Sequence, residues 1–428
     1  TIVSGTTSQG NIFFADGTSG SAEYAGFVQC LHGSSTLLKL GVNGENKLIL
    51  DANSRISLSN NDGSGAVGTT LFGYKAGLSV VSGAIQNTFI GHEVSDATMT
   101  SGADYNTAVG ASSMSALTSG TQNTAHGMNS LHRVTSGSYN TAIGVASLED
   151  ITTTSNNTAV GRQSGFYSVG ANNTYIGYQS GLGSDGSGAD NSNTAVGYQS
   201  LTAITTGDNN VAIGNSAGSS LTTGGNSVMI GNDAGASIVD SWYHVLIGDH
   251  AGTLDLSQHG TTSVGYYSLS NLTSGLGNVA LGLQAGQFIT SGASSTFIGY
   301  QAGQGITGAK LTGNANTAVG RQAGFLLQGS AGGNTLLGYL TGDSITTGTN
   351  NTLLGQGADT DDATATNQTV IGQGATGVAD NSVTLGNASV TDVYMNQDSG
   401  AKVHAGEASF TGNVTASKET DITNTTTD

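Results

Sequence analysis

The sequence predicts an all-β chain, a parallel β-solenoid (β-roll or β-helix) of about 19 coils preceded by a small N-terminal β-meander. A short motif ending in glycine recurs along most of the 428 residues, most often every 17 residues. Glycine is frequent (68 residues) and proline is absent, which is typical of short strands alternating with tight turns. Only 9% of the residues are charged, and no segment has the apolar periodicity of an amphipathic helix.

Residues 1–66 lack the repeat and predict the β-meander as a separate N-terminal domain. Pairs such as Asp16-Gly17 and Asn43-Gly44 separate short apolar runs, which is a hairpin signal. The runs are Asn11–Phe14, Gly26–Gln29, Leu37–Leu40 and Lys47–Leu50.

Residues 67–388 form the repeat domain. The unit reads Asn-Thr-Ala-(Val/Ile)-Gly, as in Asn157–Gly161, and it occurs 19 times with spacings from 14 to 21. The length changes fall in a polar stretch of each unit, which predicts a variable loop on one side of the stack. The aligned glycines are Gly73, Gly91, Gly110, Gly127, Gly144, Gly161, Gly177, Gly197, Gly214, Gly231, Gly248, Gly265, Gly282, Gly299, Gly320, Gly338, Gly355, Gly372 and Gly386.

Each column of the aligned repeat has a physical interpretation. The residue before the glycine (position −1) is Phe, Ile, Val or Leu in 18 of 19 copies, and position −3 is always Thr or Val. This period of two places both side chains on one face of a short strand. Asn occupies position −4 in 12 of 19 copies and is expected to stack on its own copies through amide hydrogen bonds. The glycine marks a bend or close backbone approach that excludes a Cβ atom.

Position −2 faces away from the Val/Ile column and is also apolar, usually Ala but also large, as in Phe89 and Tyr175. Two adjacent apolar columns indicate that both faces of the strand are buried. One face would fill the coil, and the other requires a partner. We therefore expect an intertwined or side-by-side homotrimer with the small Ala column at its axis or interface. A monomeric solenoid with one half-exposed face is the alternative.

Residues 389–428 predict a short β segment followed by a frayed tail. Val390–Tyr394 and Ala408–Phe410 are the last apolar runs, and residues 416–428 are polar and rich in Thr. The chain begins at Thr1 without a signal-peptide pattern, so we expect a piece of a longer or processed chain.

Composition restricts the possible partners. The net charge of −18 disfavours nucleic acid and anionic membrane surfaces. No run reaches the roughly 18–20 apolar residues that span a bilayer. A lone cysteine, Cys30, rules out a disulfide framework within the chain. We expect no nucleic-acid partner and no membrane insertion.

The repeats resemble the head repeats of trimeric autotransporter adhesins, which are left-handed parallel β-rolls packed as trimers. Asn226–Gly231 and Asn381–Gly386 come close to that family's unit. The flanks are similar to bacteriophage tail fibres, in Asn11–Gly20 followed by Glu23–Phe27 and in Leu385–Tyr394. The resemblance implies an extracellular fibre of the virion that contacts a host-surface glycan or protein and joins other fibre or virion proteins. A bacterial surface adhesin head is the alternative.

Catalysis is not expected. Acidic residues are sparse and lie mostly in the variable loops, so the paired carboxylates of a polysaccharide-cleaving enzyme are missing. Gly214–Gly218 matches the nucleophile-elbow pattern, but a Ser- and Gly-rich loop follows it where the elbow requires a helix. A polysaccharide depolymerase is therefore only the third hypothesis.

Two candidate ion sites are present, and no other cofactor is expected. Asp359, Asp361 and Asp362 lie in the densest acidic loop and could hold Ca²⁺, or form a solvated loop. His126 replaces Val/Ile in a column expected to be core. Three copies of His126 could meet near a trimer axis and bind an anion or metal, or each ring could be a locally hydrogen-bonded core substitution.

Tyrosine recurs directly after the glycine. Rings stacked along a rod could hold sugars, or they could simply cover the corner of each coil. The candidates for a glycan surface are Tyr178, Tyr198, Tyr266, Tyr300 and Tyr339.

Overall fold

The computed structural model describes residues 9–14, 26–31, 37–42, 45–51, 56–58 and 68–394, except 187 and 255–258. Every regular element in these residues is a β-strand, and none of them forms a helix long and apolar enough to cross a membrane. The segments expected at 408–410 and 416–428 lie outside the described residues.

The N-terminal strands form the predicted antiparallel meander, in which each strand pairs with the next along the chain. The four apolar runs each fall inside one of its strands, and a fifth short strand follows them. The strands are β1 (Gln9–Phe14), β2 (Gly26–Leu31), β3 (Leu37–Val42), β4 (Glu45–Asp51) and β5 (Ile56–Leu58).

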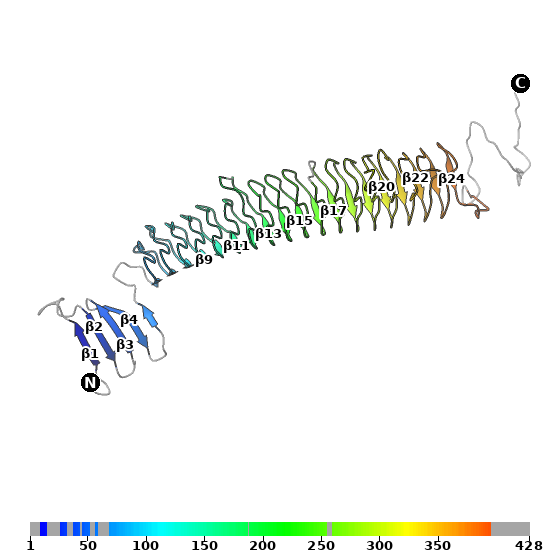
Figure 1. Ribbon diagram of the computed structural model, residues 1–428. Helices are drawn as coiled ribbons and strands as arrows, with labels where there is room; N and C mark the ends of the chain where they lie inside the picture. The colour runs from blue at the N-terminus through cyan, green and yellow to red at the C-terminus, as the bar shows by residue number, and fades with distance from the viewer. Residues whose placement is uncertain are drawn as a thin grey trace, which may run out of the picture.

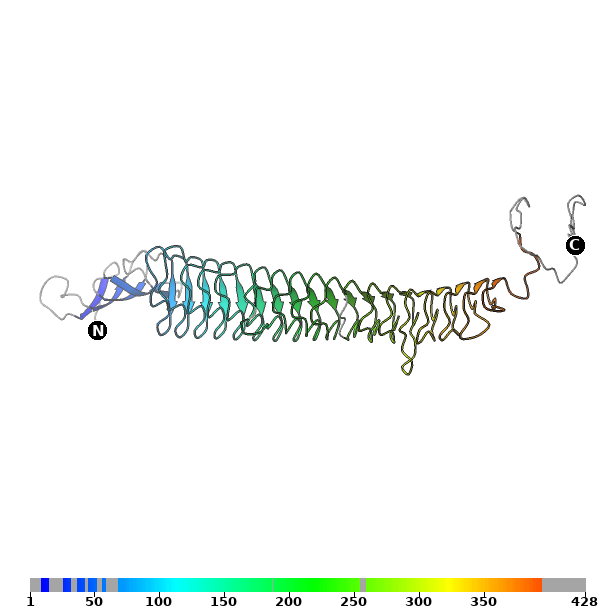
Figure 2. The same cartoon turned by 90° about the horizontal axis from the view of Figure 1, so that it is seen from above.

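The repeats form the predicted parallel β-solenoid, a long rod with one three-residue strand per coil (Figures 1 and 2). Each strand pairs in register with the next, Thr158 beside Thr174 and Val160 beside Ile176, for example. The strands are β6 (Thr70–Phe72), β7 (Thr88–Ile90), β8 (Thr107–Val109), β9 (Thr124–His126), β10 (Thr141–Ile143), β11 (Thr158–Val160), β12 (Thr174–Ile176), β13 (Thr194–Val196), β14 (Val211–Ile213), β15 (Val228–Ile230), β16 (Val245–Ile247), β17 (Thr262–Val264), β18 (Val279–Leu281), β19 (Thr296–Ile298), β20 (Thr317–Val319), β21 (Thr335–Leu337), β22 (Thr352–Leu354), β23 (Thr369–Ile371) and β24 (Val383–Leu385).

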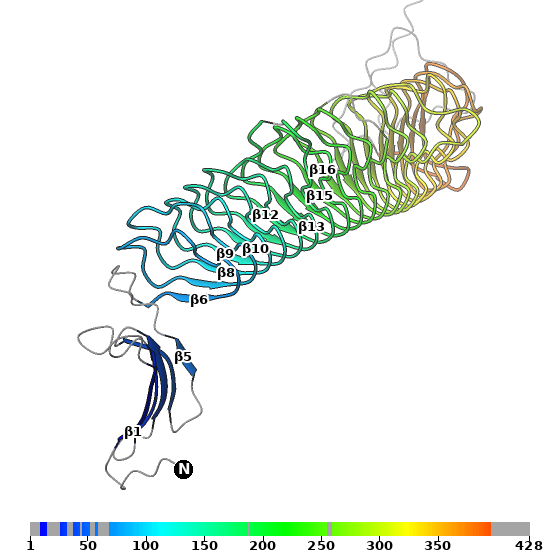
Figure 3. The same ribbon diagram turned by 60° about the vertical axis from the view of Figure 1, so that its left-hand side comes forward.

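The stack is open at both ends. Among the described strands, β6 pairs only with β7, and β24 pairs only with β23. Figure 3 shows the strands following one another along one side of the coils, while loops close the other sides. At about 4.8 Å per rung, 19 rungs correspond to a rod on the order of 90 Å long. The longest rung, from Gly299 to Gly320, contains a small turn with an antiparallel bridge between Ile306 and Ala309.

The interior of the coil corrects the expected orientation of the strands. The middle residue of every strand from β7 to β23 is buried, including Ala159, Tyr175 and Phe297. The Ala column therefore fills the coil and cannot lie at an axis between chains. The first and third residues of each strand, Thr/Val and Val/Ile, point outward and are half-buried or exposed. The sequence predicted two opposite apolar faces correctly, but assigned the small column to the wrong one.

Two inner columns compensate each other in volume. Where the strand contributes Ala, as at Ala125, the residue four after the glycine is often large, as at Leu131. Where the strand contributes a large residue, that position is often glycine. A Cβ on Gly181 would collide with the Tyr175 ring of the same rung, and one on Gly303 would collide with the Phe297 ring. The coil thus keeps its cross-section because one side shrinks where the other grows.

The repeat glycine is required by a backbone contact between rungs. Gly91 has φ +142°, and a Cβ there would lie 2.6 Å from the carbonyl oxygen of Gly110. Only glycine adopts this φ readily and allows the next rung to approach so closely. The predicted role of the glycine as a strand-ending bend is confirmed.

The Asn column forms the predicted ladder inside the coil. The Asn140 amide nitrogen donates to Asn123 Oδ1 (3.1 Å) and to the Thr154 carbonyl (3.0 Å). Its Oδ1 accepts the backbone N–H of Asn157 (3.0 Å). Buried polar groups are costly unless paired, and this arrangement pairs both ends of each amide. The ladder lapses at Ser227, His244 and Thr261, which occupy the same position in three consecutive rungs.

Candidate functional site

The outward side chains of β6–β24, which we call the strand face, form a uniform surface along the rod. It consists of the first and third residues of each strand. All of these residues are Thr, Val, Ile, Leu or Phe, with the single exception of His126. No carboxylate, Lys or Arg interrupts the surface, although the chain has a net charge of −18.

The third-position column of the strand face is apolar and accessible in the single chain, and the Thr/Val column beside it is uncharged. Leu281 is 48% exposed, Leu337 45% and Ile143 41%. Three extended residues across 19 rungs correspond to roughly 900 Å². Contiguous apolar patches larger than a few hundred Å² on soluble proteins usually mark an interaction site. A stable protein interface buries about 800 Å² per partner, so the strand face is large enough to be one.

His126 lies at the end of β9, on the strand face, where it is exposed. The prediction that it occupies the core of the coil is therefore wrong, because the whole Val/Ile column points outward. Val109 and Ile143 pair with it on the two neighbouring rungs. Its ring makes no hydrogen bond to the described residues, so no local partner accounts for it.

The tyrosines that follow the glycine line one corner of the rod, where neighbouring rings and guanidinium groups contact some of their faces although Tyr198 and Tyr300 stay 53% and 42% exposed. Tyr178 and Tyr198 stack with centroids 5.4 Å apart, and Arg162 lies over Tyr178. Arg321 lies over both Tyr300 (5.5 Å) and Tyr339 (5.4 Å). The structure brings these candidates together in two ladders, but each ladder uses ring faces that a sugar would need.

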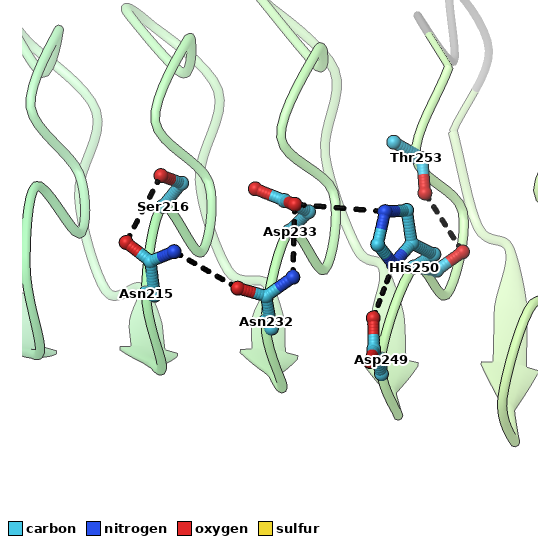
Figure 4. A network of polar contacts seen from close by, with 7 residues as sticks. All are labelled: Asn215, Ser216, Asn232, Asp233, Asp249, His250 and Thr253. Carbon is cyan, nitrogen blue, oxygen red and sulfur yellow. Dashed lines mark hydrogen bonds and ion pairs between the residues drawn. The ribbon is translucent and has the colours of Figure 1, made fainter.

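The fifth tyrosine, Tyr266, makes an edge contact with Tyr267, and Tyr267 in turn stacks on the imidazole of His250 at 4.5 Å. Figure 4 shows His250 between two carboxylates, Asp249 and Asp233, with Nε2 of His250 3.6 Å from Asp233. These groups are partly exposed, and ion pairs of this kind contribute little to stability. The corner is a surface polar network with no enclosed site.

The acidic loop does not assemble its carboxylates. Asp359 accepts hydrogen bonds from the backbone N–H groups of Thr360 (2.9 Å) and Ser344 (3.3 Å), and partial burial raises the pKa of its carboxyl. Asp361 accepts from the Gln368 amide, and Asp362 accepts from Thr364. Across the part of the chain that the structure describes, no three His, Cys, Asp or Glu side chains are placed to hold a metal ion.

A buried phenol–carboxylate pair was not predicted. Tyr175 donates from its hydroxyl to Asp190 Oδ2 (2.5 Å), and Ser168 donates to the same carboxylate (2.9 Å). Burial raises the pKa of Asp190 to about 6, against the opposing effect of these hydrogen bonds. The sequence did contain a signal for this pair, namely a tyrosine in a column of Ala and aliphatic residues. A buried phenol needs a hydrogen-bond partner, so a polar group had to lie nearby.

A second feature missed from the sequence is an aromatic ledge on the loop side of the rod. Trp242 packs over Gly225, where a Cβ would lie 2.6 Å from the indole. The adjacent Tyr243 is 63% exposed. On the next two rungs the equivalent residues are Gly260 and Gly277, where a Cβ would meet nothing within 4 Å among the described residues. The Tyr243 ring thus borders a step at which the described residues of the next two rungs place no side chain in its column.

No family model matches this chain, and no curated protein matches it either.

Proposed function

We propose that this chain is one of three identical subunits of an extracellular structural fibre, joined side by side along their strand faces. The observation that carries the proposal is the strand face itself: 19 rungs of outward Thr, Val, Ile, Leu and Phe with no charged side chain. Burial of apolar surface stabilises association by about 25 cal/mol per Å² before the costs of association are subtracted.

A second copy of the chain is the partner that fits this surface. Two rods with net charge −18 repel one another over most orientations, and the strand face is the side on which neither contributes charge. The spacing between rungs is the same in every copy of the chain. When two copies align along their lengths, each rung of one copy therefore meets the equivalent rung of the other. Closed rings of three leave no strand face exposed, which fits a soluble fibre.

We further propose that the fibre belongs to a bacteriophage tail, where it contacts the host surface and joins other fibre or virion proteins. A bacterial surface adhesin head is the alternative. The rod supports a mechanical role, because its backbone is hydrogen-bonded from rung to rung and its ladders need no cofactor. We propose no catalytic role for it.

Light scattering of chromatographed protein tests the assembly. Three chains of 42.5 kDa give about 128 kDa, and we expect that mass for the wild type. Ile213→Lys on the strand face should shift the mass toward 42.5 kDa, since it buries an unpaired charge. Asn215→Lys, on the neighbouring exposed corner, is the matched control and should leave the mass unchanged. A wild-type mass of 42.5 kDa would refute the proposal.

For the host-surface ligand, the aromatic ledge at Tyr243 is favoured over the tyrosine ladders. Tyr243 faces glycine on the following rung, whereas Tyr105 lies between Gln86 and Gln122 in the same column. An aromatic face beside an open step suits stacking of a sugar ring. Glycan-array binding lost in Tyr243→Ala and kept in Tyr105→Ala would support a glycan contact here, and equal binding by both variants would oppose it.

A further inference from the structure

His126 is the one polar aromatic group in the strand face. The 18 other strands carry Phe, Ile, Val or Leu at the equivalent position, and both flanking rungs, with Val109 and Ile143, are apolar. A solvent-facing surface would tolerate many polar residues in this column. A single histidine in an otherwise apolar column therefore calls for an explanation that concerns this rung alone.

Threefold symmetry would place three His126 side chains at one height. In a side-by-side trimer whose axis runs along the rods, equivalent residues of the three chains share a level. This argument rests on the proposed assembly. The imidazole of one chain then faces two further imidazoles, with Val109 and Ile143 on the neighbouring rungs and Thr124 beside it on its own strand.

Closing the interface removes water from all three rings at once. Within one chain the His126 ring has no hydrogen-bond partner among the described residues, so its two nitrogens rely on water. A buried polar atom without a partner is destabilising, and three rings incur this cost together. A shared ligand that accepts electron pairs from three neutral imidazoles removes that penalty in a single step.

We propose that the fibre binds one divalent transition-metal ion of the zinc class at β9, held by His126 from each of the three chains. Three imidazole nitrogens and one water make a tetrahedral set of the kind that Zn²⁺ adopts. Imidazole suits Zn²⁺, Ni²⁺ and Cu²⁺, whereas Ca²⁺ and Mg²⁺ require oxygen ligands that the strand face does not offer beyond threonine hydroxyls. An anion would need the three histidines protonated, which places three like charges together in an apolar layer.

The role of such a site is to fix the register of the chains. The strand face repeats every rung, so two rods that slip by one rung still bring apolar residues together. Register is weakly specified in uniform strands. A metal that needs three His126 rings at one level is satisfied by one alignment only, and each one-rung slip loses it.

Zinc titration of chelator-treated protein, followed by calorimetry and elemental analysis, tests the site. We expect one Zn²⁺ per three chains and visible absorption from bound Co²⁺. His126→Val restores the residue type of the column, so the variant should remain a trimer while its zinc affinity falls by about 100-fold or more. His250→Asn removes the histidine flanked by two carboxylates at the exposed corner, and it should keep the wild-type stoichiometry.

The outcomes separate the two proposals. A trimeric wild type that binds no more zinc than His126→Val overturns the metal site and leaves the fibre proposal standing. Uptake of one zinc per chain, or uptake lost in His250→Asn, also overturns it, since the ion would then bind within a single chain. A monomeric wild type, seen by light scattering of the same sample, refutes the assembly and the metal site together.

Discussion

Replacing Asn140 by alanine tests whether the buried amide ladder holds the rungs together. The substitution removes two hydrogen bonds donated by the side chain, to Asn123 Oδ1 and to the Thr154 carbonyl. It also leaves the backbone N–H of Asn157 without its acceptor. An orphaned buried donor costs about 1–3 kcal/mol, and the lost hydrogen bonds add to that. We therefore expect a local destabilisation of roughly 3 kcal/mol.

Hydrogen exchange is the appropriate assay, because solenoids unfold rung by rung and a single melting temperature does not describe them. A loss of roughly 3 kcal/mol corresponds to about 100-fold faster exchange of the amides between 140 and 160. Asn215→Ala is the matched control. It removes an exposed hydrogen bond to Asn232 Oδ1 (2.9 Å) and should change local exchange less than threefold.

An equal, small effect of the two alanine substitutions would refute the reasoning. It would mean that water reaches the ladder, or that the backbone ladder alone fixes the rungs. A large effect confined to Asn140→Ala would support the interpretation of the Asn column as a buried polar network.

Three further predictions follow from the coil interior. Gly303→Leu and Phe297→Ala should each cost about 3 kcal/mol or more, by overpacking and by a cavity, whereas the double variant should cost less than either. The folded pKa of Asp190, about 6, lies above its ordinary 3.8, so ionisation of this carboxyl should lower the wild-type free energy of unfolding by roughly 3 kcal/mol as pH rises from 4 to 6. Asp190→Asn should not show this decrease. The folded pKa of His244, about 4, lies below its ordinary 6.5, so the wild-type free energy of unfolding should also fall as pH falls from 6.5 to 4. His244→Asn should not show this second decrease.

The two pH effects oppose each other in the wild type. Asp190 favours folding at low pH because its neutral form is buried, and His244 favours folding at higher pH for the same reason. Exchange rates near each residue, measured at pH 4 and 6.5 and corrected for intrinsic chemistry, separate them. A pH profile unchanged in both variants would contradict the burial of these groups.

Much of the fold could be predicted from the sequence because one chemical constraint recurs in each rung. The glycine, the Thr-x-Val alternation and the Asn column are each satisfied by contact with the same residue of the next rung, so the repeat itself specifies parallel register. The antiparallel meander was predicted for the same kind of reason, since its turn pairs lie between apolar runs.

The direction of the strand was not predictable from hydrophobicity alone. Ala and Val/Ile are both apolar, and alternation says only that they face opposite sides. The deciding information lies elsewhere in the rung. Leu131 and Leu148 are buried in rungs whose strands carry Ala, and Gly165 and Gly181 make room for Tyr175. The pairing of large residues at one inner position with small residues at the other would have predicted that the Ala column lies inside the coil and His126 outside.

The candidate sites depended on side-chain details that a pattern does not contain. Tyrosine at a fixed register predicted a ladder, but whether ring faces stay free depends on Arg162 and Arg321 on neighbouring rungs. The ledge at Tyr243 exists because two later rungs carry glycine in its column. Both features come from differences between rungs, whereas an alignment of the repeats emphasises the residues that the rungs share.

Hydroxyl-radical footprinting of the native protein tests most directly whether the strand face is covered by other copies. Leu281 and Leu337 on the strand face are 48% and 45% exposed in one chain, and Leu276, away from it, is 52% exposed. If three chains share that face, Leu281 and Leu337 should be oxidised at least about fivefold more slowly than Leu276, since burial excludes the radical's solvent. Oxidation of all three leucines at similar rates would contradict the assembly.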